Sequence, residues 1–161
     1  MSEKTEVYEW KAKDVDDAVK QLWLALAREM FEIEHFILPS EANANKWLEF
    51  VREGLASGKN LLFVAKSKDK IVGFALAGVP REPSLDVAEF VGSLNDVYVL
   101  PEFRRKGIGK KLSNHCLKKM KDMGVKTVRL TVLSENKAAV RLYEQLGFKV
   151  YRYGMLKPFE H

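Results

Sequence analysis

The chain has 161 residues, enough for one domain with a sizeable core, and its composition is typical of a soluble globular protein. It contains no apolar run of about eighteen residues, which excludes a membrane-spanning helix, and its polar, acidic N-terminus differs from a signal peptide. The single cysteine, Cys116, excludes an internal disulfide framework and favours a cytoplasmic location. The formal net charge of +5 favours an anionic ligand or partner.

The first third of the chain predicts one strand followed by two helices. Apolar and polar side chains alternate over residues 6–12, which is typical of a strand. Apolar residues at helical spacing predict a helix over 15–34, with Asp14 as its N-cap. Pro39 interrupts this pattern, and a second helix is predicted over 43–56.

The middle of the chain predicts three strands. Two short apolar runs, 61–66 and 71–79, flank a polar turn and predict an antiparallel hairpin. A further strand is predicted over 94–100, with residues 87–91 as its candidate beginning. Gly92 lies between these two parts, and glycine in a strand often marks a bulge or a bend.

Residues 95–113 combine a strand end, a basic turn with two glycines and the start of a helix. Pro101 ends the strand, and apolar residues at four-residue spacing predict a helix over 106–123 that stops at Gly124. Cys116 falls on the apolar face of this helix. It is therefore expected in the core rather than as a nucleophile.

The beginning of this helix has the features of a phosphate-binding turn. Unpaired N–H groups in a first helical turn attract anions, and glycines let a ligand approach the backbone. Four cationic side chains surround the turn: Arg104, Arg105, Lys106 and Lys110. The spacing of Gly107 and Gly109 matches neither the Walker loop nor the GxGxxG fingerprint. An ordinary turn with a solvated basic patch is the alternative interpretation.

The last part of the chain predicts a strand over 125–133, a helix over 136–146 and a final strand over 148–155. Ser134 or Asn136 is expected to cap the helix. The complete order, βααβββαβαβ, predicts a single domain over residues 1–161. Its fold class is α/β (α+β), with helices flanking a mixed central sheet.

Two sequence blocks resemble the GNAT superfamily of N-acetyltransferases. The run RRKGIG at 104–109, after a strand that includes residues 97–99, resembles the superfamily's acyl-CoA-binding motif. Residues 130–148, LTVLSENKAAVRLYEQLGF, resemble its closing segment, with the pattern Asn-x-x-Ala-x-x-Leu-Tyr-x-x-x-Gly-Phe. The resemblance covers about the C-terminal two thirds of the chain. It implies the same order of elements and acetyl-CoA as co-substrate.

The resemblance also implies how acetyl-CoA is bound. The strand backbone is expected to pair with the pantetheine amides, and the turn with the pyrophosphate. Asn136 matches an asparagine that commonly contacts the pantetheine or an ordered water, although a plain helix cap is an equally good use of this residue. The expected cofactor-binding residues are Val97, Tyr98, Val99, Arg104, Arg105, Lys106, Gly107, Ile108, Gly109, Lys110, Asn136, Ala139 and Tyr143.

Catalytic residues follow from the same resemblance. Tyr143 matches the tyrosine that often protonates the CoA sulfur in this family, and packing on the inner face of its helix is the alternative interpretation. Family members often place a carboxylate on the strand before the phosphate turn. The candidates here for the general base are Asp96, then Glu89, then His35.

Together these features predict an N-acetyltransferase that moves the acetyl group of acetyl-CoA to a primary amine by direct attack. The amine belongs to a small molecule, a peptide or a protein. A non-catalytic acyl-CoA sensor or interaction module of the same fold is the alternative. A nucleic-acid binder is disfavoured because no recognition motif accompanies the basic helix.

Other partners are weighed from composition. Three histidines and one cysteine show no metal-ligand spacing, so no metal is expected. A membrane partner is not expected either. A homodimer is an open alternative because dimers are frequent among GNAT relatives.

Overall fold

The computed structural model describes residues 3–80, 82–83, 85 and 90–160. The chain divides into two compact units, Met1–Thr131 and Val132–His161, which we call unit 1 and unit 2. The expectation of one domain over residues 1–161 stays a prediction. No helix within the described ranges is long and apolar enough to cross a membrane.

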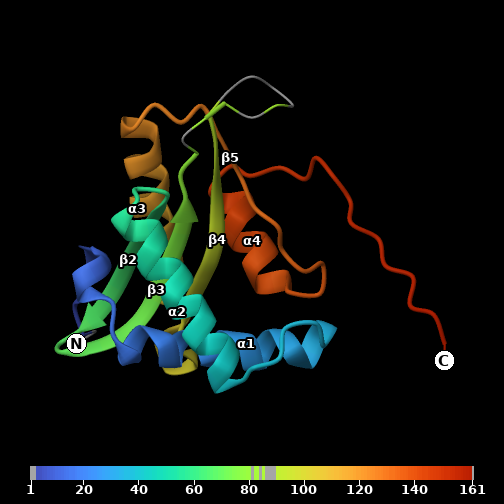
Figure 1. Cartoon of the computed structure of the whole chain (residues 1–161), viewed down its shortest axis with the longest axis horizontal. Helices are drawn as coiled ribbons and strands as arrows, with labels where there is room; N and C mark the ends of the chain where they lie inside the picture. Colours follow the sequence, from blue (N-terminus) through green and yellow to red (C-terminus); the bar gives the residue numbers. More distant parts are fainter. Residues whose placement is uncertain (1–2, 81, 84, 86–89, 161) are drawn as a thin grey trace. The chain divides into compact units, whose positions relative to one another are not determined.

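The described part of unit 1 contains a five-stranded mixed sheet with strand order β1-β2-β3-β4-β5 (Figure 1). Its first four strands are antiparallel, and β5 is parallel to β4. The strands are β1 Thr5–Trp10, β2 Asn60–Ser67, β3 Lys70–Gly78, β4 Val91–Val99 and β5 Thr127–Arg129. The predicted fold class, helices on a mixed sheet, is confirmed. Strand 125–133 was predicted too long, since β5 spans Thr127–Arg129 and, within the described residues, pairs with Val91–Ser93.

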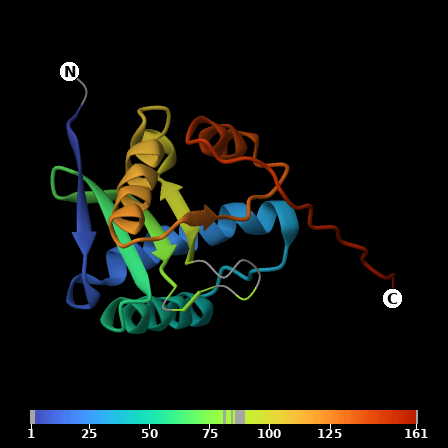
Figure 2. The same ribbon diagram turned by 90° about the horizontal axis from the view of Figure 1, so that it is seen from above.

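Three helices cover the two faces of this sheet. Helices α1 (Asp17–Glu34) and α2 (Glu41–Ala56) lie on one face, and α3 (Ile108–Asp122) lies on the other (Figure 2). The prediction of Asp14 as the N-cap of α1 is wrong. The cap is Asp16, whose Oδ1 accepts bonds from the N–H groups of Ala18 and Val19 at 3.0 and 3.4 Å.

Asp14 fails as the cap because the chain makes a short 3-10 turn, η1 (Ala12–Asp14), before the helix begins. Within that turn its carboxylate accepts a 2.8 Å bond from the N–H of Lys11. The side chain of Asp14 therefore caps η1 instead of α1.

Each face of the sheet has its own core. The core on the α1 and α2 face is rich in large side chains: Trp10, Leu22, Trp23, Leu48, Leu62, Phe74, Leu76 and Tyr98. On the other face α3 buries Ile108, Leu112, Cys116 and Met120. The prediction that Cys116 is a core residue is confirmed, and burial raises the pKa of its thiol to about 12.

A β-bulge divides strand β4 at Asn95. Leu94 pairs with Ala77 and Asp96 pairs with Leu76, so Asn95 is the extra residue. Because side chains alternate along a strand, the extra residue turns those that follow it to the opposite face. Asp96 thereby shares the α1 and α2 face with its partner Leu76. A bulge or bend was expected at Gly92, whereas the structure has the bulge at Asn95, three residues further along the chain.

Unit 2 contains helix α4 (Lys137–Gln145), which ends before Gly147. Asn136 caps the helix, since its Oδ1 accepts a 3.2 Å bond from the N–H of Ala139. The strand predicted over 148–155 is not among the strands that the structure describes. Its alternating aromatic side chains suit a strand, but side-chain alternation alone does not form one, since a strand also needs a neighbour that pairs with its backbone.

Candidate active site

The loop between β4 and α3 has an unusual backbone. Its residues 101–103 form a single 3-10 turn, η2 (Pro101–Phe103). Arg105 (φ 62°) and Gly107 (φ 77°) both adopt the left-handed conformation. Glycine reaches this region without steric cost, whereas other residues do so rarely. We call residues 100–107 the basic loop.

Helix α3 begins directly after the basic loop, and no side chain caps it. Gly107 is the N-cap, and its carbonyl accepts the first helical bond, from the N–H of Lys111 at 3.0 Å. The N–H groups of Ile108, Gly109 and Lys110 precede that bond and form the positive end of the helix dipole. This helix start is therefore suited to an anion.

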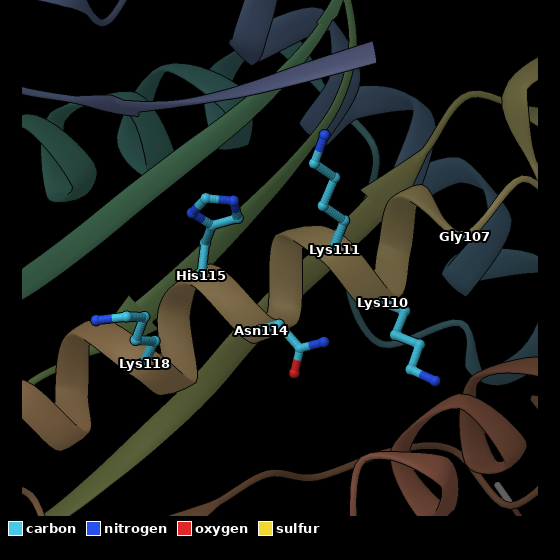
Figure 3. A pocket seen from close by; sticks show the side chains of 6 residues that line it. All are labelled: Gly107, Lys110, Lys111, Asn114, His115 and Lys118. Carbon is cyan, nitrogen blue, oxygen red and sulfur yellow. The ribbon is translucent and has the colours of Figure 1, made fainter. Parts of the chain in front are cut away.

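Cationic side chains continue along the outer face of α3. A hollow of about 370 Å³ follows this face and is lined by Gly107, Lys110, Lys111, Asn114, His115 and Lys118 (Figure 3). Lys110 and Lys111 point to opposite sides of the helix (Figure 3), and Lys111 donates a 2.8 Å bond to the carbonyl of Thr5 in β1. The helix start is thus flanked by positive charge that complements phosphate groups.

One edge of β4 is paired over only part of its length. The parallel ladder with β5 covers the three residues Val91–Ser93. Among the described residues, the rest of β4 has ladder partners only on β3, with Val97 opposite Ala75. A strand edge of this kind can pair with the amide groups of an extended ligand.

Of the two candidate bases that the structure describes, Asp96 has a side-chain hydrogen-bond partner. Its partly buried carboxylate accepts a 3.2 Å hydrogen bond from the indole N–H of Trp47 in α2. Trp47 is held in turn by Trp23, with ring centroids 5.7 Å apart, and by Phe74 at 5.5 Å. Burial raises the pKa of Asp96 above its ordinary value, and the bond from Trp47 opposes this effect.

The second described candidate, His35, has a different setting. His35 is the C-cap of α1, with φ 58°, and its exposed ring packs edge-on against Phe31 at 4.9 Å. Its position follows from ending the helix. Glu89 lies outside the described residues.

Arg104 makes contacts that the sequence did not suggest. Its guanidinium donates to the carbonyl of Val99 at 2.8 Å and to both carboxylate oxygens of Glu29, in α1, at 2.7 and 2.9 Å. The hydroxyl of Tyr98 donates to the same carboxylate at 3.0 Å. The side chain of Arg104 thus joins the basic loop to α1.

The remaining expected site residues lie in unit 2. Ala139 contributes its N–H to the cap made by Asn136. Tyr143 lies in α4, and its ring packs edge-on against Phe148 at 5.9 Å. Its backbone carbonyl accepts a 3.0 Å bond from the N–H of Phe148, which closes the turn after the helix.

Comparison with known proteins identifies the family. The model of the acetyltransferase (GNAT) family matches residues 17–148, which is most of the chain. This chain belongs to the GNAT family of acetyltransferases. The family uses acetyl-CoA as co-substrate. Within the described residues, no group of three or more histidine, cysteine, aspartate or glutamate side chains could hold a metal ion.

Curated relatives carry acetyltransferase names. The [ribosomal protein bS18]-alanine N-acetyltransferase of Salmonella typhimurium is 32% identical over 111 residues, 69% of this chain and 70% of that protein. A thialysine N-epsilon-acetyltransferase of Sus scrofa is 46% identical over 54 residues, 34% of this chain and 32% of that one.

Solved structures share the GNAT fold. A mutant of the BH1408 protein of Bacillus halodurans has a TM-score of 0.80 at 19% identity, and the match covers 96% of this chain and 99% of that one. A putative acetyl transferase of Pyrococcus furiosus has a TM-score of 0.71 at 23% identity, covering 97% and 100%.

Sequence reasoning missed two residues that contact the candidate site. In the sequence, Trp47 fits only the apolar spacing of a helix. The acceptor of its indole N–H, the carboxylate of Asp96, lies near it only in the folded chain. Glu29 looked like a solvated residue on the polar face of α1. Its partner Arg104 is 75 residues away in the sequence, so no local pattern connects the two.

Proposed function

We propose that this GNAT protein transfers the acetyl group of acetyl-CoA to a primary amine by direct attack. The observation that carries the proposal is the arrangement along one continuous stretch of unit 1. A carboxylate with a raised pKa lies on β4, and the basic loop and the uncapped start of α3 follow within a few residues. A potential proton acceptor and a potential phosphate site thus lie on neighbouring elements.

The residues present fit acetyl-CoA. The N–H groups at the start of α3 and the side chains of Arg105, Lys106 and Lys110 would hold the pyrophosphate. The backbone of Val97 and Val99 would pair with the pantetheine amides. When bound, acetyl-CoA supplies an activated acetyl thioester.

Asp96 is proposed as the general base. An amine must lose a proton in order to attack, and a carboxylate accepts it best when its pKa lies nearer to neutral than usual. Burial moves the pKa of Asp96 in that direction. The indole N–H of Trp47 bonds one oxygen of this carboxylate and so orients it. The amine passes its proton to the carboxylate either directly or through water.

Tyr143 is proposed as the general acid. A phenol with an ordinary pKa of about 10 can donate a proton to a departing thiolate. Asn136 and Ala139 would shape the start of the helix that carries it. The match of the closing segment to the family pattern supports these roles.

The acceptor is proposed to be an amine on a small molecule, a peptide or a protein. The names of the relatives support this range, because one names an alanine of a ribosomal protein and another names thialysine. A cytoplasmic location and a homodimer stay predictions.

The test is release of CoA thiol from acetyl-CoA, scanned over polyamines, amino acids, aminoglycosides and peptides with free N-termini. Turnover is expected on one acceptor class, and Tyr143→Phe should lower kcat about tenfold or more. Tyr153→Phe, which changes an exposed tyrosine of the same unit, is the control and should leave kcat unchanged. Acetyl-CoA binding without turnover on any acceptor would favour the sensor alternative.

A further inference from the structure

Three side chains from separate elements meet at the basic loop: Glu29 of α1, Tyr98 of β4 and Arg104. We call them the anchor cluster. The carboxylate of Glu29 accepts two bonds from Arg104, at 2.7 and 2.9 Å, and one from the hydroxyl of Tyr98, at 3.0 Å. The guanidinium also lies over the ring of Tyr98, 5.3 Å from its centroid. Each charged or polar group in the cluster thus has a partner within it.

The anchor cluster lies where the basic loop leaves the sheet, and it fixes the position of Arg104 there. Besides Glu29, Arg104 bonds the carbonyl of Val99, the last residue of β4, at 2.8 Å. Nη2 of the guanidinium donates to both oxygens of Glu29 and Nε donates to Val99, so two of its nitrogens are held by charge-assisted or backbone hydrogen bonds. The next residue, Arg105, is the one that adopts φ 62°, and Gly107 follows with φ 77°. The cluster therefore holds the residue from which the unusual backbone starts.

We propose that Glu29 is a positioning residue for acetyl-CoA. Acting through Arg104, it holds the basic loop in the conformation that presents the N–H groups at the start of α3. This inference rests on the proposed function. It assigns the guanidinium of Arg104 to loop geometry, whereas the family resemblance alone suggested that Arg104 binds the cofactor.

The protonation state of the cluster suits a permanent anchor. Burial, together with the neighbouring carboxylate of Glu29, raises the pKa of Tyr98 to about 12. The phenol therefore stays protonated and continues to donate to Glu29 over the range in which enzymes work. The guanidinium stays charged throughout this range.

The two assignments for Arg104 predict opposite results when Glu29 is removed. If Arg104 contacted the phosphates directly, Glu29→Ala would free a cation, and CoA would bind equally well or more tightly. If Glu29 acts by positioning, the loop loses its anchor and must be ordered when the ligand binds, which weakens binding. The sign of the change in the Kd for CoA therefore separates the two.

The experiment measures the Kd for CoA by calorimetry, and KM and kcat with acetyl-CoA and with S-acetyl-pantetheine, which lacks the pyrophosphate. We expect Glu29→Ala to raise the Kd for CoA and the KM for acetyl-CoA about tenfold, with kcat within about twofold of wild type. The KM for S-acetyl-pantetheine should not change. Tyr98→Phe removes one of the three bonds to Glu29 and should have a smaller effect in the same direction.

Two variants make the result decisive. Glu49→Ala, at an exposed position of α2, is the matched control and should leave every constant unchanged. Glu29→Gln keeps the shape of the side chain without its charge, and supplies a folded variant if Glu29→Ala unfolds. It should raise the KM for acetyl-CoA by a smaller factor than the alanine.

Unchanged or tighter CoA binding in both Glu29 variants would overturn the inference. An equal rise in KM for both acyl donors would also overturn it, because that result points to a general displacement of α1. Failure of the wild-type protein to bind CoA would instead refute the proposed function, and this inference with it.

Discussion

The two halves of strand β4 differ although they form one continuous strand. Before Asn95, the strand is paired on both edges, with β3 and β5, and Gly92 lies against the core beneath α3. After Asn95, its described ladder is with β3 alone, and Asp96 and Tyr98 face α1 and α2. The first half, Val91–Leu94, contains no titratable side chain, whereas the second half carries Asp96 and Tyr98, which have polar partners.

The difference shows how one extra residue divides a strand into a structural part and a chemical part. Without the bulge, Asp96 would point into the aliphatic core of α3, where it would lack a hydrogen-bond partner. With the bulge, it meets an indole N–H at 3.2 Å. Substitutions in the second half should therefore affect chemistry, and substitutions in the first half should affect stability.

The largest effect is expected for Asp96→Asn. The amide cannot accept the proton of the amine, so kcat/KM should fall about 10²-fold or more. The fold should be retained, because the amide oxygen can still accept the bond from Trp47. Initial rates with the best acceptor, measured across pH, check this prediction. A variant with wild-type rates would exclude Asp96 as the base.

Asp96→Asn should lower activity but should not lower stability. The pKa of Asp96 is higher in the folded protein than in the unfolded chain, so the folded protein holds this proton more tightly. Its carboxylate therefore lowers the free energy of unfolding as pH rises through the folded-state pKa. Asp96→Asn should remove this loss, and its Tm at neutral pH should equal or exceed that of wild type.

The sequence predicted the elements of unit 1 well because their signals are local. Apolar spacing located all three helices, and the charges and glycines between 104 and 110 marked the start of α3. It could not predict the bulge at Asn95, which depends on the register of β4 against β3. It also missed Glu29 and Trp47, since their roles arise only when distant segments meet.

The next effect is expected in the first half of β4, at Gly92. A β-carbon there would lie 2.7 Å from Sδ of Met120 and 3.2 Å from Cγ1 of Val125, and Met120 is fully buried. Gly92→Ala should lower the free energy of unfolding by about 1–3 kcal/mol, because a well-packed core resists added volume. Denaturant unfolding measures this loss, while kcat at low temperature should stay close to wild type.

Gly154→Ala is the control for this prediction. A β-carbon at Gly154 meets no atom within 4 Å, so its unfolding should match wild type. If Gly92→Ala lowered kcat without lowering stability, the division of β4 into two parts would be wrong.

The smallest effect is expected for Trp47→Phe, which keeps an aromatic ring next to Trp23 and removes only the N–H donor. That donor stabilises the carboxylate of Asp96 and lowers its pKa, so its loss should raise the pKa further. Because the base must be deprotonated, the acidic limb of the kcat/KM profile should shift to higher pH, with little change at its plateau. Trp23→Phe changes the neighbouring indole, which has no bond to Asp96 in the described contacts, and should leave the limb in place. A limb that shifts equally in both variants would show that aromatic packing, rather than the hydrogen bond, sets the pKa of Asp96.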